Sequence, residues 1–289
     1  MKKVFVPVDF SGQSISAFRF ALDIAAKSYG SVHLLHVISL PVLHDSPFFV
    51  AESFRRPLYD ELKEVAHQKF EKILQAFNTT NTPVTTEVVI SGSIHRALLE
   101  SVQRAKADLV VMGTRGASGL REWVIGSNTE KFVRAARVPV IAVKKYIGSQ
   151  SIRNIVFPNI LDLEDQEELI MKIKALQHFF SATLHIIWVN TPAVFKPDKE
   201  VRQQMKAFAE RFMLANYTIN VFNYTNEESG IIEFTNQVKG DLIAMGTNGL
   251  TGLAHMVAGS VAEDVVNHAQ YPVWTYSTKS PKTITMQKS

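Results

Sequence analysis

Short apolar runs alternate with amphipathic segments along the first half of the chain. The runs at 4–8 and 109–112 are apolar almost throughout, which is typical of strands that are buried on both faces of a sheet. Between such runs, apolar residues recur three or four positions apart, as at Ile15, Phe18 and Leu22, and this spacing indicates one face of a helix. We expect strands at 4–8, 32–38, 86–90, 109–112 and 138–143, with helices at about 15–25, 58–77, 94–106 and 127–136. Alternating strands and helices predict an α/β fold in which helices cover both faces of a parallel sheet.

The same pattern occurs twice. Residues 108–116 (DLVVMGTRG) recur as residues 241–249 (DLIAMGTNG), at an offset of 133 residues. At the start of each copy, residues 3–9 match residues 153–159 at an offset of 150. A period of this length indicates a duplicated domain rather than a solenoid of short repeats. We therefore predict two tandem open parallel sheets that are related by a pseudo-two-fold axis.

The joint between the copies is expected near 146–151, because residues 148–151 (GSQS) are polar and turn-prone. The expected domains are 1–147 and 151–277, followed by a mobile tail at 278–289 that lacks apolar periodicity. Pro139 and Pro272 begin the last strand of each copy, where a missing N–H is tolerated. This favours an edge position for both strands.

A glycine-rich segment with the spacing Gly-x2-Gly-x9-Gly-Ser follows an apolar strand in each copy. Ligands of open parallel sheets bind at the carboxyl ends of strands, which is where this segment begins. Glycine allows the backbone N–H groups to approach phosphate oxygens closely, and the free amides at the start of a helix attract anions. The spacing therefore predicts a phosphate-binding loop. Its residues are Gly113, Gly116, Gly126 and Ser127 in the first copy, and Gly246, Gly249, Gly259 and Ser260 in the second.

A structural interpretation of the same residues stays open. Residues 127–130 (SNTE) and 260–263 (SVAE) both fit the capping box, in which serine and glutamate satisfy the helix start without any ligand. Two better-known nucleotide motifs are absent from the sequence: the Gly-x4-Gly-Lys-[Ser/Thr] loop and a Gly-x-Gly-x2-Gly turn after the first strand. The sequence is therefore neither that of a P-loop NTPase nor that of a Rossmann dehydrogenase.

Composition narrows the class of protein further. The chain is 46% hydrophobic and 20% charged, as expected of a globular protein with a real core. The net charge of +4 comes without a block of like charges, so no nucleic-acid partner is expected. The absence of cysteine excludes disulfides and thiolate zinc sites. No metal site is expected either, since His33 and His36 point to opposite faces of one strand. No apolar run is long enough to span a membrane, and a cytoplasmic location is expected.

The sequence resembles the universal stress protein family in residues 6–11 (VPVDFS), 34–37 (LLHV) and 138–140 (VPV), and in the glycine spacing. The family implies five parallel strands in the order 3-2-1-4-5 in each copy, and the binding of ATP, often with Mg²⁺. The resemblance implies that Asp9 and Val37 contact the nucleoside end of ATP. For the ribose and phosphates in the first copy it implies Met112, Gly113, Gly116, Gly126, Ser127 and Asn128. In the second copy the implied residues are Val189, Met245, Gly246, Gly249, Gly259, Ser260 and Val261.

Asp9 distinguishes the two copies, because Asn159 stands at its position at the offset of 150. Asparagine presents an amide donor where a ribose hydroxyl or an adenine amino group needs an acceptor. We therefore expect the better nucleotide site in the first copy. A second interpretation of Asp9, as the N-terminal cap of the following helix, stays open.

Three functions follow from these features. The first is a nucleotide-binding, stress-response regulatory protein, in which the stress role rests on the resemblance alone. The second is a slow ATP hydrolase or phosphotransferase, although no general base is evident beside the glycine loop and no catalytic residue is assigned. The third is a nucleotide-free scaffold whose paired halves mimic a homodimer, and a homodimer of the chain itself stays open.

Overall fold

The structure is a computed structural model that describes residues 1–39, 52–114, 132–133, 135–159, 161, 166–247 and 258–277, with the backbone alone at 52–56 and 258–260. The tail expected at 278–289 and the helix start expected at Ser127 lie outside these residues. The elements of the first half are β1 (Lys3–Pro7), α1 (Gly12–Ser28), β2 (Ser31–Ser39), α2 (Glu52–Ala76), β3 (Val84–Ser91), α3 (Ile94–Ala105), β4 (Leu109–Gly113) and β5 (Val140–Val143).

A short 3₁₀ turn, η1 (Ser149–Ser151), leads into the second half. Its elements are β6 (Asn154–Pro158), α5 (Glu167–Phe180), β7 (Thr183–Asn190), α6 (Asp198–Arg211), β8 (Tyr217–Asn223), α7 (Glu227–Gln237), β9 (Leu242–Gly246), α8 (Ala258–His268) and β10 (Val273–Tyr276). The order of strands and helices repeats that of the first half, as the duplicated pattern predicts.

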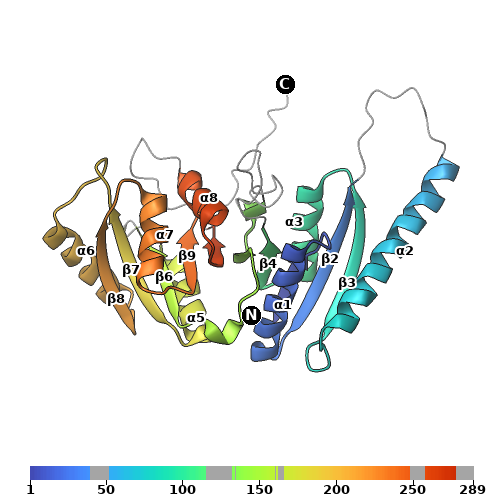
Figure 1. Cartoon of the computed structure of the whole chain (residues 1–289), viewed down its shortest axis with the longest axis horizontal. Helices are drawn as coiled ribbons and strands as arrows, with labels where there is room; N and C mark the ends of the chain where they lie inside the picture. The colour runs from blue at the N-terminus through green and yellow to red at the C-terminus, as the bar shows by residue number, and fades with distance from the viewer. Residues whose placement is uncertain are drawn as a thin grey trace, which may run out of the picture.

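The ten strands within the described ranges form one sheet in the order β3-β2-β1-β4-β5-β10-β9-β6-β7-β8 (Figure 1). Within each half the strands are parallel and follow the order 3-2-1-4-5, which confirms the expected fold of the halves. The expectation of two separate sheets is wrong, because β5 and β10 pair in the antiparallel direction, with Ile141 opposite Trp274. The edge position expected for the strands after Pro139 and Pro272 is wrong for the same reason. Each of these strands has an open side within its own half, and the other half closes it.

Side-chain caps fix the starts of several helices. Ser11 precedes α1 and accepts a hydrogen bond from the N–H of Ser14, and Ser93 and Asn226 do the same for α3 and α7. Such caps satisfy one of the amides that a helix leaves free in its first turn. The helices therefore begin where a short polar side chain follows the end of a strand.

The core lies on both faces of the sheet. On one face, residues of α1, α2, α5 and α6 form a single cluster with strands of both halves, so that Val143 of the first half and Trp274 of the second belong to one core. On the other face, α3 with Phe132 and Val133 covers the first half, and α7 and α8 cover the second (Figure 1). The carboxyl ends of the strands emerge between these layers.

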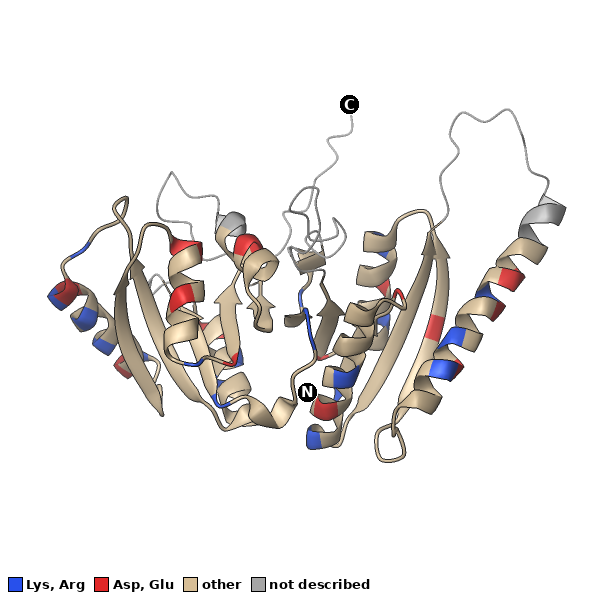
Figure 2. Ribbon diagram, viewed as in Figure 1, with Lys and Arg blue, Asp and Glu red and all other residues tan. Residues whose placement is uncertain are grey.

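Charged residues lie mainly on the outer surfaces of the helices. Figure 2 shows acidic and basic residues interleaved along α2 and α6. On α6, Arg202 and Asp198 form an exposed ion pair one helical turn apart, with 2.7 Å between nitrogen and oxygen. Interleaving of this kind is typical of solvated helix faces, and it agrees with the small net charge of the chain.

Candidate functional site

The hydrogen bonds of the sheet align the two halves one residue differently from the sequence comparison. Val4 of β1 is level with Leu109 of β4, and Ile155 of β6 is level with Leu242 of β9. Leu109 and Leu242 are equivalent residues of the repeat, since they are 133 positions apart. Val4 therefore corresponds to Ile155, at an offset of 151 rather than 150.

The equivalence that we expected between Asp9 and Asn159 is therefore wrong. Asn159 stands at the position of Val8, and Ile160 stands at that of Asp9. The opening strands are apolar on both faces, so no alternation of polar and apolar residues fixes their register in the sequence. The two halves therefore differ at the position of Asp9 by more than the expected replacement of a carboxylate by an amide. By this offset the residue of the second half that corresponds to Asp9 in the sequence is Ile160, which lies outside the described residues.

Three residues of the first half follow the ends of β1, β4 and β5, and Val37, near the end of β2, is at the same level. The offsets between level residues are 28 from β1 to β2 (Lys3 to Ser31), 105 from β1 to β4 (Val4 to Leu109) and 30 from β4 to β5 (Val110 to Val140). Continued past the last paired residues, these offsets place Asp9 level with Val37 and Thr114, and Thr114 level with Lys144. We call Val37, Asp9, Thr114 and Lys144 the carboxyl-end row.

The row lies on the face of the sheet that α3 covers. Side chains two residues apart on a strand point to the same face. Phe5 of β1 and Met112 of β4 both belong to the core cluster beside α3, and Val37 packs at its rim. Thr114 is two residues after Met112 and continues on this face, whereas Asp9 lies two residues beyond the end of β1 and its side chain bonds to the start of α1. The offset between β1 and β2 puts Asp9 level with Val37; the sequence assigns both residues to the nucleoside end of a ligand.

Asp9 is held as an ionised acceptor by the residue two positions on. Its Oδ1 accepts hydrogen bonds from the backbone N–H of Ser11 at 3.0 Å and from the Ser11 hydroxyl at 2.5 Å. Burial would raise the pKa of Asp9, but these hydrogen bonds outweigh it and lower the pKa below its ordinary value. The interpretation of Asp9 as a helix cap is wrong, because Ser11 caps α1. Asp9 orients the cap, and a hydrogen bond with the side chain of Ser14 in the first turn of α1 also lowers its pKa.

Gly113 has a packing role that sequence reasoning missed. A Cβ at this position would lie 2.4 Å from the carbonyl carbon of Gln13 and 2.5 Å from the nitrogen of Ser14. Only glycine allows the first turn of α1 to approach β4 this closely. At Gly246, the nearest atom to such a Cβ is Cδ2 of Leu169, at 2.8 Å. The contact at Gly113 lies on the α1 face, opposite the carboxyl-end row.

Thr114 carries a buried hydroxyl without a partner. Its side chain is 3% exposed, and Oγ1 makes no hydrogen bond within the part of the chain that the structure describes. A buried polar group left unpaired costs about 1–3 kcal/mol. At the equivalent position of the second half, the Thr247 hydroxyl donates to the carbonyl of Tyr276 at 3.5 Å. The two halves therefore differ in the hydroxyl that follows Gly113 and Gly246.

Two polar side chains bond to backbone carbonyls near the carboxyl ends of the strands: His36, on the face of β2 opposite the carboxyl-end row, and Lys144, which belongs to the row. Nδ1 of His36 donates a hydrogen bond to the carbonyl of Val8 at 2.7 Å, which fixes the backbone just before Asp9. Burial lowers the pKa of His36, so that the imidazole is neutral at pH 7. Lys144 donates to the carbonyl of Asn267 in the last turn of α8, and burial lowers its pKa as well. Sequence reasoning singled out neither for this place.

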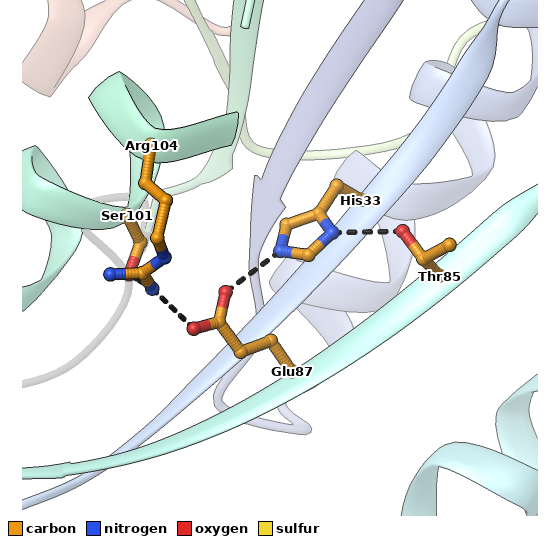
Figure 3. Close-up of polar contacts among 5 residues, drawn as sticks. All are labelled: His33, Thr85, Glu87, Ser101 and Arg104. Carbon is orange, nitrogen blue, oxygen red and sulfur yellow. Dashed lines mark hydrogen bonds and ion pairs between the residues drawn. The ribbon is translucent and has the colours of Figure 1, made fainter. Parts of the chain in front are cut away.

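His33 lies on the other side of β2 from the imidazole of His36, in a polar cluster beside α3 (Figure 3). Its ring nitrogens contact the Thr85 hydroxyl at 2.8 Å and the Glu87 carboxylate at 3.0 Å, and Glu87 also pairs with Arg104. His185 repeats the contact in the second half, with Thr218 at 2.9 Å. The cluster joins neighbouring strands and a helix. Among the described residues, no three His, Asp or Glu side chains are placed to hold a metal ion.

The second half uses the corresponding space for its own contacts. Asn159 donates to Oε1 of Gln166 at 2.7 Å and accepts from the N–H of Leu161 at 2.6 Å. A Cβ on Gly230 of α7 would lie 2.6 Å from the Val189 side chain, so α7 packs directly against Val189. Met245, like Met112 in the first half, is buried in the core.

Most of the glycine loop lies outside the described residues. This applies to Gly116, Gly126, Ser127, Asn128 and Gly249. Helix α8 begins at Ala258, so Gly259 and Ser260 lie in its first turn and Val261 follows them. The capping-box interpretation of Ser260 is therefore wrong, because the serine is inside the helix and not at its cap. The backbone amides of a first turn are the ones that a phosphate could approach.

The family model for the universal stress protein family matches residues 1–144 and 164–277 of the chain. The chain belongs to this family. A universal stress protein of Methanocaldococcus jannaschii is 31% identical over 146 residues, which is 50% of this chain and 82% of the relative. A universal stress protein of Synechocystis is 21% identical over 293 residues and covers 96% of this chain and 100% of the relative.

A solved structure shows the same double architecture. The crystal structure of a universal stress protein from Archaeoglobus fulgidus matches with a TM-score of 0.72 and 19% sequence identity, over 96% of this chain and 98% of that one. At this identity the match shows the fold alone. The helices of the described residues include none that is long and apolar enough to cross a membrane.

Proposed function

We propose that the first half of this chain binds an adenine nucleotide at the carboxyl ends of β1, β2 and β4, and that the bound nucleotide regulates a stress response. The observation that carries the proposal is the register of β1, β2 and β4, which puts Asp9, just after β1, level with Val37 and beside the strand that leads into the glycine loop. A carboxylate next to an apolar side chain suits the hydroxyls and the flat faces of a nucleoside.

The phosphates are assigned to the glycine loop. Gly113 begins the loop, and Gly116, Gly126, Ser127 and Asn128 are proposed to offer backbone amides and a hydroxyl to the phosphate oxygens. Membership of the family supports the proposal, since one universal stress protein has been solved in complex with cAMP. Where Mg²⁺ accompanies ATP, phosphate oxygens and water are expected to supply most of its ligands, which is its usual mode of binding.

The orphaned Thr114 hydroxyl also fits a bound ligand. Buried polar groups in native proteins nearly always have a partner, which can be protein, water or ligand. The second half is proposed as the weaker site, although Val189, Met245, Gly246, Gly249, Gly259, Ser260 and Val261 stand at matching positions. There, Ile160 replaces the acid and α7 packs against Val189.

The test is equilibrium dialysis of the full chain against labelled ATP, with mass spectrometry of any nucleotide that the protein retains on purification. Asp9→Asn keeps the size of the side chain but removes the charged acceptor. A hydrogen bond to a charged group is worth about 1.5–3 kcal/mol, so affinity should fall roughly tenfold to 150-fold. Asp198→Asn, on the exposed face of α6, is the matched control and should bind ATP like the wild type. Equal affinity of Asp9→Asn and wild type would exclude Asp9 from the site.

A further inference from the structure

Lys144 reaches from the first half of the chain into the second. It follows β5, and its ammonium group donates a hydrogen bond to the carbonyl of Asn267 in the last turn of α8. The two residues are 123 positions apart, and the antiparallel pairing of β5 with β10 brings them together. Ser277 is the equivalent of Lys144 in the second half, at the offset of 133, and it carries no charge. The contact between the halves is therefore made by a cation of the first half alone.

The charge of this ammonium group is not balanced by an acid of the described chain. Lys144 is half-buried, no acidic side chain pairs with it within the described ranges, and burial lowers its pKa. The carbonyls of a last helical turn carry partial negative charge and attract a cation, but they do not neutralise it. An ammonium group has three donors, and the Asn267 carbonyl uses one of them. Lys144 can therefore hold α8 and a negatively charged ligand on the carboxyl-end row at the same time.

Contacts continue from Asn267 into the body of the second half. His268 is the next residue, and its Nδ1 pairs with the carboxylate of Glu228 in the first turn of α7. Two residues further along α7, a Cβ on Gly230 would lie 2.6 Å from the side chain of Val189, so this helix packs closely on β7. The carboxyl-end row of the first half is thus joined through α8 and α7 to the carboxyl end of β7. A continuous set of packed and hydrogen-bonded groups of this kind can carry a coupling between two sites.

We propose that the second half responds to the ligand of the first half through Lys144. A negatively charged ligand on the carboxyl-end row holds the ammonium group, and the ammonium group holds the last turn of α8. Binding in the first half therefore makes the local opening of α8 less favourable. The two states of the switch are α8 tied to Lys144 and α8 released from it. The inference rests on the proposed function and gives the second half a regulatory role in it.

The test is hydrogen–deuterium exchange of the full chain, read by mass spectrometry with and without ATP, at concentrations that dialysis shows to saturate each variant. In the wild type, ATP should slow exchange of the α8 amides by about fivefold or more, which is the lower end of ordinary coupling between sites. Lys144→Met removes the ammonium group from an unbranched side chain, so α8 should exchange faster without ATP and should no longer respond to it. Lys145→Met, at the exposed neighbouring residue, is the matched control and should behave like the wild type.

Two further measurements separate charge and order of contacts. Adenosine carries no negative charge and should bind without slowing exchange in α8. Glu228→Gln weakens the contact between α8 and α7 but leaves Lys144 intact. ATP should then still slow exchange in α8, whereas the smaller slowing expected in α7 of the wild type should disappear.

Lys144→Arg covers the case in which methionine disturbs the fold. It retains the positive charge, so ATP should still slow exchange in α8, and an effect lost in both variants would show that charge is not the link. If the wild type bound ATP and Asp9→Asn bound it more weakly, but α8 did not respond to ATP, the inference would be wrong and the proposed function would stand. The same holds if Lys144→Met kept the full response. If the wild type bound no nucleotide at all, the proposed function and the inference would both fail.

Discussion

Replacement of Gly113 by alanine places a methyl group against backbone atoms of the first turn of α1, which can move only together with the helix. The new Cβ would lie 2.4 Å from the carbonyl carbon, and 2.6 Å from the carbonyl oxygen, of Gln13, and 2.5 Å from the nitrogen of Ser14. Relief of these contacts requires the first turn of α1 to move away from β4. Overpacking of a well-packed interior costs about 1–3 kcal/mol, and occasionally more. We expect Gly113→Ala to lower the unfolding free energy by about 3 kcal/mol, at the upper end of this range.

Gly246→Ala is the matched control at the equivalent position of the second half. Its Cβ would meet Cδ2 of Leu169 at 2.8 Å, with the next atom of that side chain at 3.7 Å. The end of a leucine side chain can rotate, so we expect a loss of about 1 kcal/mol or less. Urea unfolding followed by circular dichroism measures both variants. A midpoint for Gly113→Ala that is no lower than that for Gly246→Ala would refute the reasoning from backbone contact.

Two further predictions concern the pairing of β5 with β10 and the buried imidazole of His36. Trp274 is 1% exposed where β10 pairs with β5, so Trp274→Ala should lower the unfolding free energy by about 3–5 kcal/mol in calorimetry. The control Phe195→Ala, at a residue that is 70% exposed, should change the unfolding free energy by no more than about 0.5 kcal/mol. Similar losses for Trp274→Ala and Phe195→Ala would contradict a buried pairing of β5 with β10. Burial lowers the pKa of His36 in the folded chain, so below the ordinary value of 6.5 the unfolded chain binds more protons. Stability should therefore fall as the pH drops through the range just below 6.5, and His36→Gln should reduce that slope. If His36→Gln left the dependence of the unfolding free energy on pH unchanged in urea titrations, His36 would not be a source of that dependence.

The elements of each half could be predicted because their signals are local. The strand expected at 109–112 is Leu109–Gly113, and the helix expected at 94–106 is Ile94–Ala105. The duplication then extends each assignment to the second half. The antiparallel joint could not be predicted in this way. β5 and β10 are short strands that are buried at every position. Their sequences do not indicate whether the side without a partner in the same half faces solvent or pairs with another strand.

The site shows the same limit in another form. The spacing of the glycines predicts a phosphate loop, but a glycine has no side chain to show whether a ligand or a helix backbone requires it. At Gly113 the structure shows that the backbone of α1 requires a glycine. The sequence suggests that Asp9 corresponds to Asn159, because each is a polar residue at the end of an apolar strand. The hydrogen-bond register of the sheet instead aligns Asn159 with Val8. Thr114 is part of the repeated segment and is buried like Thr247, so that only its unpaired hydroxyl distinguishes it.

The central claim is that the first half holds an adenine nucleotide along the carboxyl-end row. A crystal structure of the full chain grown with ATP tests it most directly. We expect the nucleoside beside Asp9 and Val37, and the phosphates on the loop that begins at Gly113. Protein atoms that fill this space and occupy the loop amides, or ATP bound in the second half alone, would contradict the account.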